Sequence, residues 1–486
     1  MAQRQGTWGA ITELAREHQV SRPFIYDLLA TFKAQCHSLF FPPEPVASPS
    51  DDALEARLLT YRFEGRCSIA AISALMKRDG LSFSAQGSVS EWLTRIGQAL
   101  PDTLPNENEA VPLVVFANDE VYAKARPILI TVEPISSAIL RIELADNRTA
   151  DQWCAHYQGL LANGFKPVQM TSDAGGGIVA ANAATFPDIP WQLDTFHSVA
   201  HRLGDWDRRL KKRIERAIKH AADREDKLAS AKSDAVINKR LMHCFAADHD
   251  VRKATQLHEN FRYLYREIIQ QLNTFDTAGR LREQSQAKST IDTALELMEA
   301  LGYQAMNKGI LSVRKALPHC LSYFETAKGA VQQCEKLTDN HDALAALYLA
   351  WQWNKAIIKS KQTERKHHAI EQRNFYLEWA RFVIGDEKQA TQLQEAVDRK
   401  LDQIIQASSM VECINSLLRP YLNNSRNQLT QEFLNTFMFY HNHRRYRAGK
   451  RKGKTPIEIL TGEAQEEDWV VLLQKALRKG ESLLAA

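Results

Sequence analysis

The spacing of hydrophobic and polar positions changes twice along the chain. Up to about residue 100, apolar residues recur every three or four positions, as they do on helices. Between about 111 and 197 they gather instead into short runs, and from 198 to about 440 the helical spacing returns. This pattern predicts a small sheet-containing segment between two helical segments.

The middle segment is expected to form three strands, a helix, a strand, a helix and a last strand. Short connections join the first three strands and imply antiparallel pairing, whereas the later helical crossovers imply parallel pairing. We therefore predict an α+β multidomain protein with a mixed five-stranded sheet. The expected strands are Leu113–Ala117, Ile128–Val132, Ala138–Leu144, Val168–Thr171 and Trp191–Phe196, and the expected helices are 149–163 and 178–185.

Residues 1–41 resemble a helix-turn-helix unit. Ser21 is suited to be the N-cap of its second helix, and Pro23 falls in the first turn, where a missing N–H costs nothing. The alternative is a plain helical hairpin. If the unit binds DNA, Arg22 and Tyr26 are the expected contacts.

Residues 51–100 form a second helical unit, again in helix-turn-helix order. Ser68 to Lys77 is amphipathic, and Ser88 to Glu91 reads as a capping box that opens the next helix. A structural role competes here with DNA binding. The other expected divisions are linkers at 42–50 and 101–110, core at 111–200, an all-helical insertion at 201–400, more core at 401–462 and a helical tail at 463–486.

Bulk composition narrows the class of protein. The 486 residues are 44% hydrophobic and 25% charged, which is ordinary for a soluble globular protein. The seven scattered cysteines fit a reducing compartment, and no apolar run is long enough to span a bilayer. We expect a cytoplasmic, nucleoid-associated and bacterial protein.

Positive charge is concentrated in two short runs. Arg208 to Lys219 holds seven Lys or Arg with one Glu, and Arg444 to Lys454 holds seven with no acid. Such runs favour a polyanion as partner. The expected DNA contacts from these runs are Arg208, Arg209, Lys211, Lys212, Arg444, Arg445, Arg447, Lys450, Arg451, Lys452 and Lys454.

Three acidic residues are the candidates for chemistry. Asp119 and Asp173 each end an apolar run of the predicted sheet, and Glu412 lies in a helical stretch about 240 residues beyond Asp173. Two strand-end aspartates and a glutamate from a helix packed across them suit two Mg²⁺ ions at a phosphodiester. Glu120 competes with Asp119, and strand alternation alone does not choose between them. Glu133 also competes, although a hairpin is expected there.

Several motifs in order resemble DDE transposases of insertion sequences. Thr171-Ser-Asp-Ala-Gly-Gly resembles their second-acid motif, and Val411-Glu-Cys-Ile-Asn-Ser-Leu-Leu-Arg resembles their third-acid helix. Asn118-Asp-Glu with the strands after it resembles the opening of their catalytic domain. The stretch from Phe439 to Leu460 resembles the end of such transposases and of retroviral-type integrases.

This resemblance implies an RNase H-like sheet with Asp119, Asp173 and Glu412 as metal ligands. It also implies Mg²⁺, with Mn²⁺ as substitute. The chain departs from the compact family pattern in one way: about 240 residues separate Asp173 from Glu412, so we expect a helical domain to be inserted before the third acid. Asp194-Thr-Phe-His197 resembles a signature of several bacterial transposase groups, in which His197 would assist proton transfer or hold a phosphate. A structural histidine is the alternative.

The predicted function is a DNA transposase that cuts transposon ends and joins the 3′-hydroxyl to target DNA. Its expected partners are the terminal inverted repeats, the target DNA and further copies of the chain. The alternatives are a transposase-derived regulator without catalysis and an RNase H-like nuclease or resolvase. Within the insertion, Trp351, Trp353 and Trp379 are candidates either for stacking on a base or for filling its core.

Overall fold

The computed structural model describes residues 9–40, 51–81, 84–106, 111, 113–360 and 362–484. The chain divides into two compact units, Met1–Val89 and Ser90–Ala486. The expected linker at 42–50 lies outside the described residues, as does the part of the second linker from 107 to 110.

The first unit begins with two helices, α1 (Ala10–Glu17) and α2 (Arg22–Phe40). Leu14 of α1 and Ile25 of α2 are buried together in a small apolar cluster between the two helices. Ser21 caps α2 as predicted, because its Oγ accepts the Phe24 amide at 3.3 Å.

The same unit continues with α3 (Asp51–Leu59), the π-helix η2 (Thr60–Glu64) and α4 (Ile69–Arg78). Ser68 caps α4 by accepting the Ala71 amide at 3.2 Å. The next helix, α5 (Gln86–Gln98), crosses the boundary between the units. Because α5 already begins at Gln86, the capping box predicted from Ser88 to Glu91 is wrong.

The second unit contains a mixed five-stranded sheet in the order β3-β2-β1-β4-β5. The first three strands pair antiparallel, and β4 and β5 pair parallel, so the predicted mixed sheet is confirmed. The strands are β1 (Leu113–Ala123), β2 (Arg126–Val132), β3 (Ile139–Leu144), β4 (Lys166–Ser172) and β5 (Trp191–Leu193).

Two strands end elsewhere than predicted. β1 runs on to Ala123 because its antiparallel pairing with β2 continues to Arg126, long after its parallel pairing with β4 has ended. β5 stops at Leu193, because the chain turns at once into the π-helix η4 (Phe196–His201). The prediction that Asp119 ends a strand is therefore wrong, and so is the prediction that the fifth strand continues to Phe196, just before His197.

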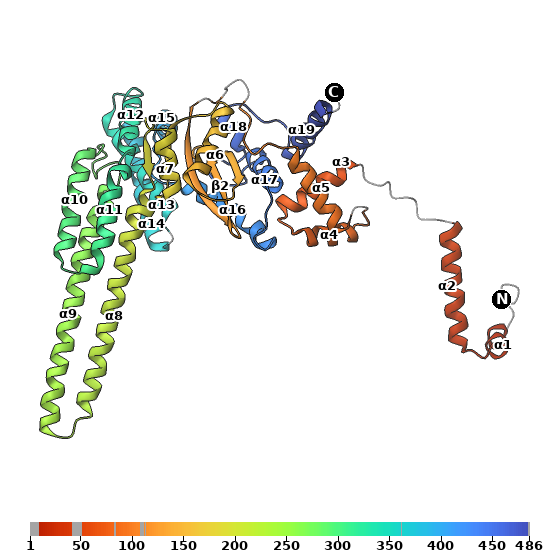
Figure 1. Ribbon diagram of the computed structural model, residues 1–486, viewed down its shortest axis with the longest axis horizontal. Helices are drawn as coiled ribbons and strands as arrows, with labels where there is room; N and C mark the ends of the chain where they lie inside the picture. The colour runs from red at the N-terminus through yellow and green to blue at the C-terminus, as the bar shows by residue number, and fades with distance from the viewer. Residues whose placement is uncertain are drawn as a thin grey trace. The chain divides into compact units, whose positions relative to one another are not determined.

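Helices cover both faces of the sheet. Helices α6 (Ala150–Ala162) and α7 (Gly176–Thr185) bury one face, where Phe116 of β1 shares an apolar cluster with Tyr157 of α6. Helices α16 (Ser409–Asn424) and α17 (Gln431–His443) contact the sheet through β1, β2 and β3 (Figure 1). Two distant parts of the chain thus enclose one sheet.

The edge strand β3 has its backbone groups occupied by side chains and by a neighbouring segment. The Asn442 side chain bonds both the amide and the carbonyl of Ile139, at 2.8 and 2.9 Å. The Leu104 amide donates to the Leu140 carbonyl at 2.7 Å. Residues 101–106, expected to be part of a linker, therefore pack along this edge, which removes unpaired edge groups that would invite aggregation.

Only helices and short connections, with one isolated bridge between Phe275 and Leu281, fill the described residues from 202 to 401. Helices α8 and α9 run side by side as a long hairpin (Figure 1). The helices are α8 (Arg202–Ala229), α9 (Asp234–Gln271), α10 (Gln284–Ala300), α11 (Asn307–Cys320), α12 (Tyr323–Glu335), α13 (His341–Lys359), α14 (Thr363–Ile384) and α15 (Glu387–Leu401), with the 3₁₀ turn η5 (Gln304–Met306).

Trp351 fills the core of this helical block, where 4% of it is exposed, whereas Trp379 is 47% exposed. The chain ends with α18 (Pro456–Thr461) and α19 (Trp469–Leu484). In the described part of the chain, no helix is both long and apolar enough to cross a membrane.

One glycine of the run after Asp173 is required by packing. A Cβ on Gly177 would lie 2.0 Å from the Arg148 carbonyl oxygen, whereas one on Gly176 would meet nothing within 4 Å. A glycine run of this kind can let the backbone approach a phosphate closely. At Gly177 the close neighbour is instead the chain segment that leads into α6.

We predict that Gly177→Ala destabilises the second unit by roughly 2–4 kcal/mol, because backbone must move to relieve the overlap. Gly176→Ala is the matched control and should be neutral or stabilising by up to about 1 kcal/mol, since alanine favours helix. Thermal unfolding of both variants measures this. Equal melting temperatures for the two variants would contradict the packing argument.

Candidate active site

The register of β1 and β4 brings the two candidate aspartates to the same level of the sheet. The last parallel pair joins Ala117 to Thr171, and Asp119 and Asp173 each lie two residues further along the chain. Beyond that pair β1 continues with β2, while β4 ends at Ser172. The two aspartates thus lie at the same end of the sheet, where β1 and β4 part.

Helix α16 brings the third acid to this position. Buried Val411, Ile414 and Leu418 fix one side of the helix against the protein. The Asn415 amide of the next turn donates to Asp119 Oδ2 at 2.8 Å. Glu412, three residues earlier in the first turn, has a side chain that is 49% exposed.

Asp194 joins the end of β5 to the start of α16. Its Oδ1 accepts the His197 amide at 2.8 Å, and its Oδ2 accepts the amide and hydroxyl of Ser408 at 2.8 and 2.9 Å. Asp194 is 1% exposed and lies 214 residues from Ser408 in the chain. This buried carboxylate therefore fixes the N-terminus of α16, one turn before Glu412.

His197 contacts the third acid directly. Its Nε2 lies 2.5 Å from Glu412 Oε1. Burial opposes a charge on the ring, but the hydrogen bond to Glu412 and the negative charges of Asp194, Glu412 and Asp119 together raise the pKa of His197. The imidazole is thus held beside the carboxylates, where it can hold or move a proton.

Asp119 and Glu120 point to opposite faces of β1. Asp119 faces α16 through Asn415, whereas the Glu120 carboxylate pairs with Arg148 at 2.5 Å, and its side chain is 7% exposed. Arg148 precedes α6 on the other face of the sheet. Strand alternation alone did not choose between Asp119 and Glu120. It does so once α16 and α6 are known to cover opposite faces of the sheet, because only Asp119 faces α16.

The environment of Asp119 disfavours a negative charge. Burial raises its pKa to about 7; the Glu120 amide works against this shift, and the charges of Asp173, Glu120 and Glu412 add to it. The folded chain therefore holds a proton on Asp119 more tightly than the unfolded chain does. The stability that this proton contributes is present at acidic pH and is lost as the pH rises from about 4 to about 7.

We predict that Asp119→Asn stabilises the metal-free protein above pH 7, on the order of 2 kcal/mol, because asparagine cannot acquire the disfavoured charge. The gain should disappear at acidic pH, where the wild-type carboxyl is protonated. Melting temperatures over a pH series with a chelator present measure it. A gain that does not vary with pH would show that the charge is not its cause.

Asp173 is held by the backbone that follows it. Its Oδ1 accepts the Gly175 amide at 2.8 Å, just before α7 begins. This contact fixes the carboxylate at the end of β4. The other contender in this part of the chain, Glu133, is 5% exposed and accepts bonds from Ile135 and Ser136 within the β2–β3 hairpin. Glu133 therefore has a structural role.

The carboxylates of Asp119, Asp173 and Glu412 are of the chemical type that binds a divalent cation. Their present spacing, however, does not form a metal site. Among the described residues, no three His, Cys, Asp or Glu side chains are grouped as a formed metal site. Even so, Asp173 and Glu412 are near enough for their charges to raise the pKa of Asp119. Clustered carboxylates that repel one another are hard oxygen ligands of the kind that Mg²⁺ prefers.

The predicted DNA contacts on helices α2 and α8 are exposed. This holds for Arg22, Tyr26, Arg208, Arg209, Lys211 and Lys212. Arg208 forms an ion pair with Asp205, and the Arg209 guanidinium lies 4.7 Å from the centre of the Trp206 ring. The other side chains extend from the surface and remain available to a polyanion.

The basic loop, residues 444–454, uses several of its charges internally. Arg445 pairs with Glu458 at 3.0 Å, and Arg451 donates to the Ile135 carbonyl at 2.6 Å. Lys450 pairs with Asp402 at 2.8 Å. Of the other predicted contacts, Arg444 is half-buried, and Arg447, Lys452 and Lys454 are exposed.

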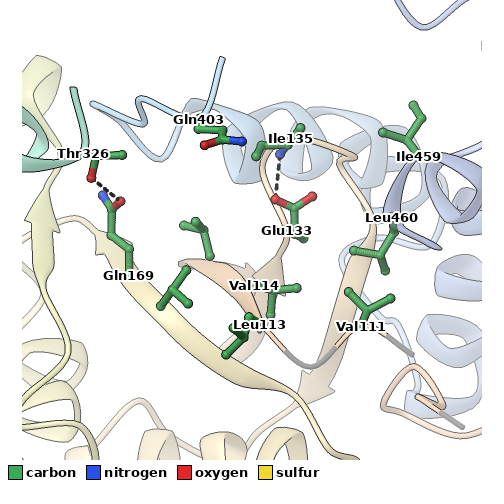
Figure 2. A pocket seen from close by; sticks show the side chains of 12 residues that line it. Val111, Leu113, Val114, Glu133, Ile135, Gln169, Thr326, Gln403, Ile459 and Leu460 are labelled. Carbon is green, nitrogen blue, oxygen red and sulfur yellow. Dashed lines mark hydrogen bonds between the residues drawn. The ribbon is translucent and has the colours of Figure 1, made fainter. Parts of the chain in front are cut away.

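A pocket of about 500 Å³ lies away from Asp119, Asp173 and Glu412, against the first residues of β1 (Figure 2). Leu113 and Val114 line it together with Ile459 and Leu460 of α18. Its one carboxylate, Glu133, is already bonded within the hairpin. The pocket thus brings no further reactive groups together.

The fold and the site define an α+β protein with carboxylates from two strands and one helix gathered at a mixed sheet. Residues 109–291 match the family model described as "Transposase, Mutator family". The matched segment includes the whole sheet, Asp119, Asp173 and His197, and ends before Glu412. The match covers less than half of the chain, and it supports DNA transposition as the function.

Comparisons with curated proteins and with solved structures add little to the family match. None of the curated proteins matches the chain. Among solved structures, the chain is similar to the "Drosophila P element transposase strand transfer complex", with 13% identity and a TM-score of 0.31 over 77% of this chain and 100% of that chain. A TM-score this low supports no argument about fold or function.

Proposed function

We propose that the chain is a DDE-type transposase with an RNase H-like core, in which Asp119, Asp173 and Glu412 are the catalytic carboxylates. The observation that carries the proposal is the convergence of β1, β4 and α16 on one place. Asn415 ties α16 to Asp119, and Asp194 ties the start of α16 to the end of β5. The large helical insertion therefore leaves the third acid beside the first two.

Asp119, Asp173 and Glu412 would hold two Mg²⁺ ions, for which Mn²⁺ could substitute. Bound at these oxygens, the ions would neutralise charge at the reacting phosphate and lower the pKa of an attacking water. The chain itself supplies the position of each carboxylate. Burial of Asp119 makes its charge depend on a counter-ion, because without one the protonated form persists up to about pH 7.

His197 is proposed to position Glu412 and to relay a proton. The ring is 41% exposed, so one side of it remains open to substrate or water. Its hydrogen bond fixes one oxygen of Glu412 and leaves the other able to act as a ligand. The raised pKa keeps the ring protonated to higher pH than a free histidine, which suits a donor to a leaving 3′-oxygen.

DNA recognition is assigned to several separate surfaces. In the proposed arrangement the helix-turn-helix units within residues 1–100 read the terminal repeats, and exposed cations of α8 and the basic loop contact phosphates. Phosphate contacts provide most of the affinity, whereas base contacts provide the choice of sequence. Because two transposon ends must be joined to one target, we propose that a dimer or larger assembly acts.

One assay separates this function from its alternatives. The protein is incubated with labelled DNA carrying the repeats that flank its reading frame, with Mg²⁺ and with a target plasmid. A joined product is the expected result for a transposase. Cleavage without joining would indicate a nuclease, and a mobility shift without cleavage would indicate a regulator.

A further inference from the structure

The distal arm, residues 217–250, is the end of the long hairpin formed by α8 and α9. It consists of the second half of α8, the turn after it and the first half of α9, and it extends beyond the other helices of the second unit (Figure 1). Nearer the start of α8, the Tyr303 ring packs against the hairpin, 6.1 Å from the Trp206 ring and 5.0 Å from the Arg213 guanidinium. In the distal arm α8 and α9 pack on each other.

The seam between the two helices follows coiled-coil spacing. A row of buried or half-buried side chains along α9 recurs at steps of three and four residues. The row consists of Cys244, Ala247, Val251, Ala254, His258 and Phe261. It faces α8, because His258 Nε2 lies 3.0 Å from Asp207 Oδ1. Within the distal arm the buried side chains are Ala221, Cys244 and Ala247. The distal arm therefore closes on small side chains.

The large apolar side chains of the distal arm lie outside this seam. Ile237, Leu241 and Phe245 follow one another at steps of four residues, so they form an exposed stripe along α9. Met242 is 65% exposed and Phe245 56%, and Ile218 of α8 is also exposed. Because hydrophobic stabilisation scales with the apolar area removed from water, the distal arm gains little from its own packing. A pair of helices packed in this way is stabilised when a further apolar surface covers it.

Charge separates the distal arm from the part of α8 that precedes it. Residues 208–216 hold six Lys or Arg and one Glu, whereas residues 217–250 hold six Lys or Arg and six Asp or Glu. A polyanion is attracted to the first segment but not to the second. Two distal arms, by contrast, do not repel each other, since each offers acids to the basic side chains of the other. The balance of charge thus favours a second copy of the chain over DNA as the partner.

We propose that the distal arm binds the distal arm of a second copy, so that four helices form one bundle with Ile218, Met242 and Phe245 inside it. A helix in such a bundle presents a wider apolar face than a two-helix seam uses, as α9 does here. The same surface meets itself on both copies, so the contact closes at two. The inference rests on the proposed function for the expectation that copies assemble, and it gives that assembly a surface. The basic residues 208–216 stay free to contact DNA.

The test measures the mass of the full-length protein by light scattering over a range of concentrations, with a chelator and without DNA. Wild type should pass from monomer to dimer in the micromolar range. Phe245→Glu and Met242→Glu each place a charge inside the bundle, and each should raise the dissociation constant at least about tenfold. Both side chains are exposed in the single chain, so the monomer should stay folded, which circular dichroism checks. The matched control is Tyr263→Glu, at an exposed position of α9 outside the distal arm, and it should dimerise as wild type does.

Hydrogen exchange locates the contact. The amides of residues 217–250 should exchange more slowly at concentrations where the dimer forms than at those where the monomer predominates, and Phe245→Glu should abolish this difference. A wild-type protein that stays monomeric up to about 100 µM would overturn the inference, because an interface of ordinary size associates below that concentration. A dimer whose distal-arm amides exchange as in the monomer would overturn it as well. Protection of these amides by terminal-repeat DNA, and not by concentration, would assign the distal arm to DNA instead.

Failure of this inference and failure of the proposed function give different results. If the distal arms pair but wild type never cuts terminal-repeat DNA with Mg²⁺, the transposase proposal fails and the inference stands. If wild type cuts and joins DNA while both glutamate variants keep the wild-type dimer, the inference is wrong and the transposase proposal stands.

Discussion

Replacing Asp119 with asparagine is expected to abolish cleavage and joining, with a loss of at least about a thousandfold. Asparagine keeps the size of the side chain and can still contact Asn415, but it loses the charge that a pair of cations requires. Binding to terminal-repeat DNA should remain near that of wild type. Cleavage rates and mobility shifts, measured on the same preparations, separate the two effects.

Glu120→Gln is the matched control for that substitution. Its carboxylate pairs with Arg148 on the face of the sheet covered by α6 and α7, away from α16. We expect at most about a tenfold change in cleavage, through a small shift of β1. If Glu120→Gln were inactive and Asp119→Asn active, Glu120 would be the first ligand, and the assignment from the two faces of β1 would be reversed.

Asp194→Ala is expected to have the largest effect on folding and activity together. The substitution removes three hydrogen bonds and leaves the amides of His197 and Ser408 without their acceptor at a buried position. Losses of this kind cost roughly 3–5 kcal/mol. Because the N-terminus of α16 is then released, Glu412 also loses its position, and cleavage should fall at least about a hundredfold at temperatures where the variant is folded.

Asp188→Ala is the control for this change, since Asp188 is exposed in the turn before β5. It should alter stability by less than about 0.5 kcal/mol. Thermal unfolding and cleavage at low temperature measure both variants. An Asp194→Ala protein that melts as wild type does and cuts normally would mean that α16 is positioned without this carboxylate.

The sheet could be predicted because each strand is recognisable from its own short stretch of sequence. The apolar runs from Leu113 to Leu193 are short and separated by turns, and chain order then fixed which pairs are antiparallel. The ends of the strands depend on tertiary pairing. β1 passes through Asp119 because β2 continues beside it, and no local property of Asp119 indicates this.

The site was harder to predict, because its contacts join residues hundreds of positions apart. The sequence around Asp194 and Ser408 does not indicate that the two residues form a hydrogen bond, although Asp194 belongs to the motif that also contains His197. Trp351 and Lys355 of α13 lie in an ordinary helical pattern, and only the fold shows that they bond Asp402 and the Ile404 carbonyl. By contrast, Asn415 falls in a motif, and its bond to Asp119 gives that position a physical role.

The central claim is that Glu412 completes a catalytic site with Asp119 and Asp173 from the far side of the helical insertion. Its most direct test is strand transfer by Glu412→Gln, with labelled terminal-repeat DNA, a target plasmid and Mg²⁺. We predict that wild type gives joined product, whereas Glu412→Gln binds the DNA normally and gives none. Joining by Glu412→Gln at a rate near that of wild type would contradict the account.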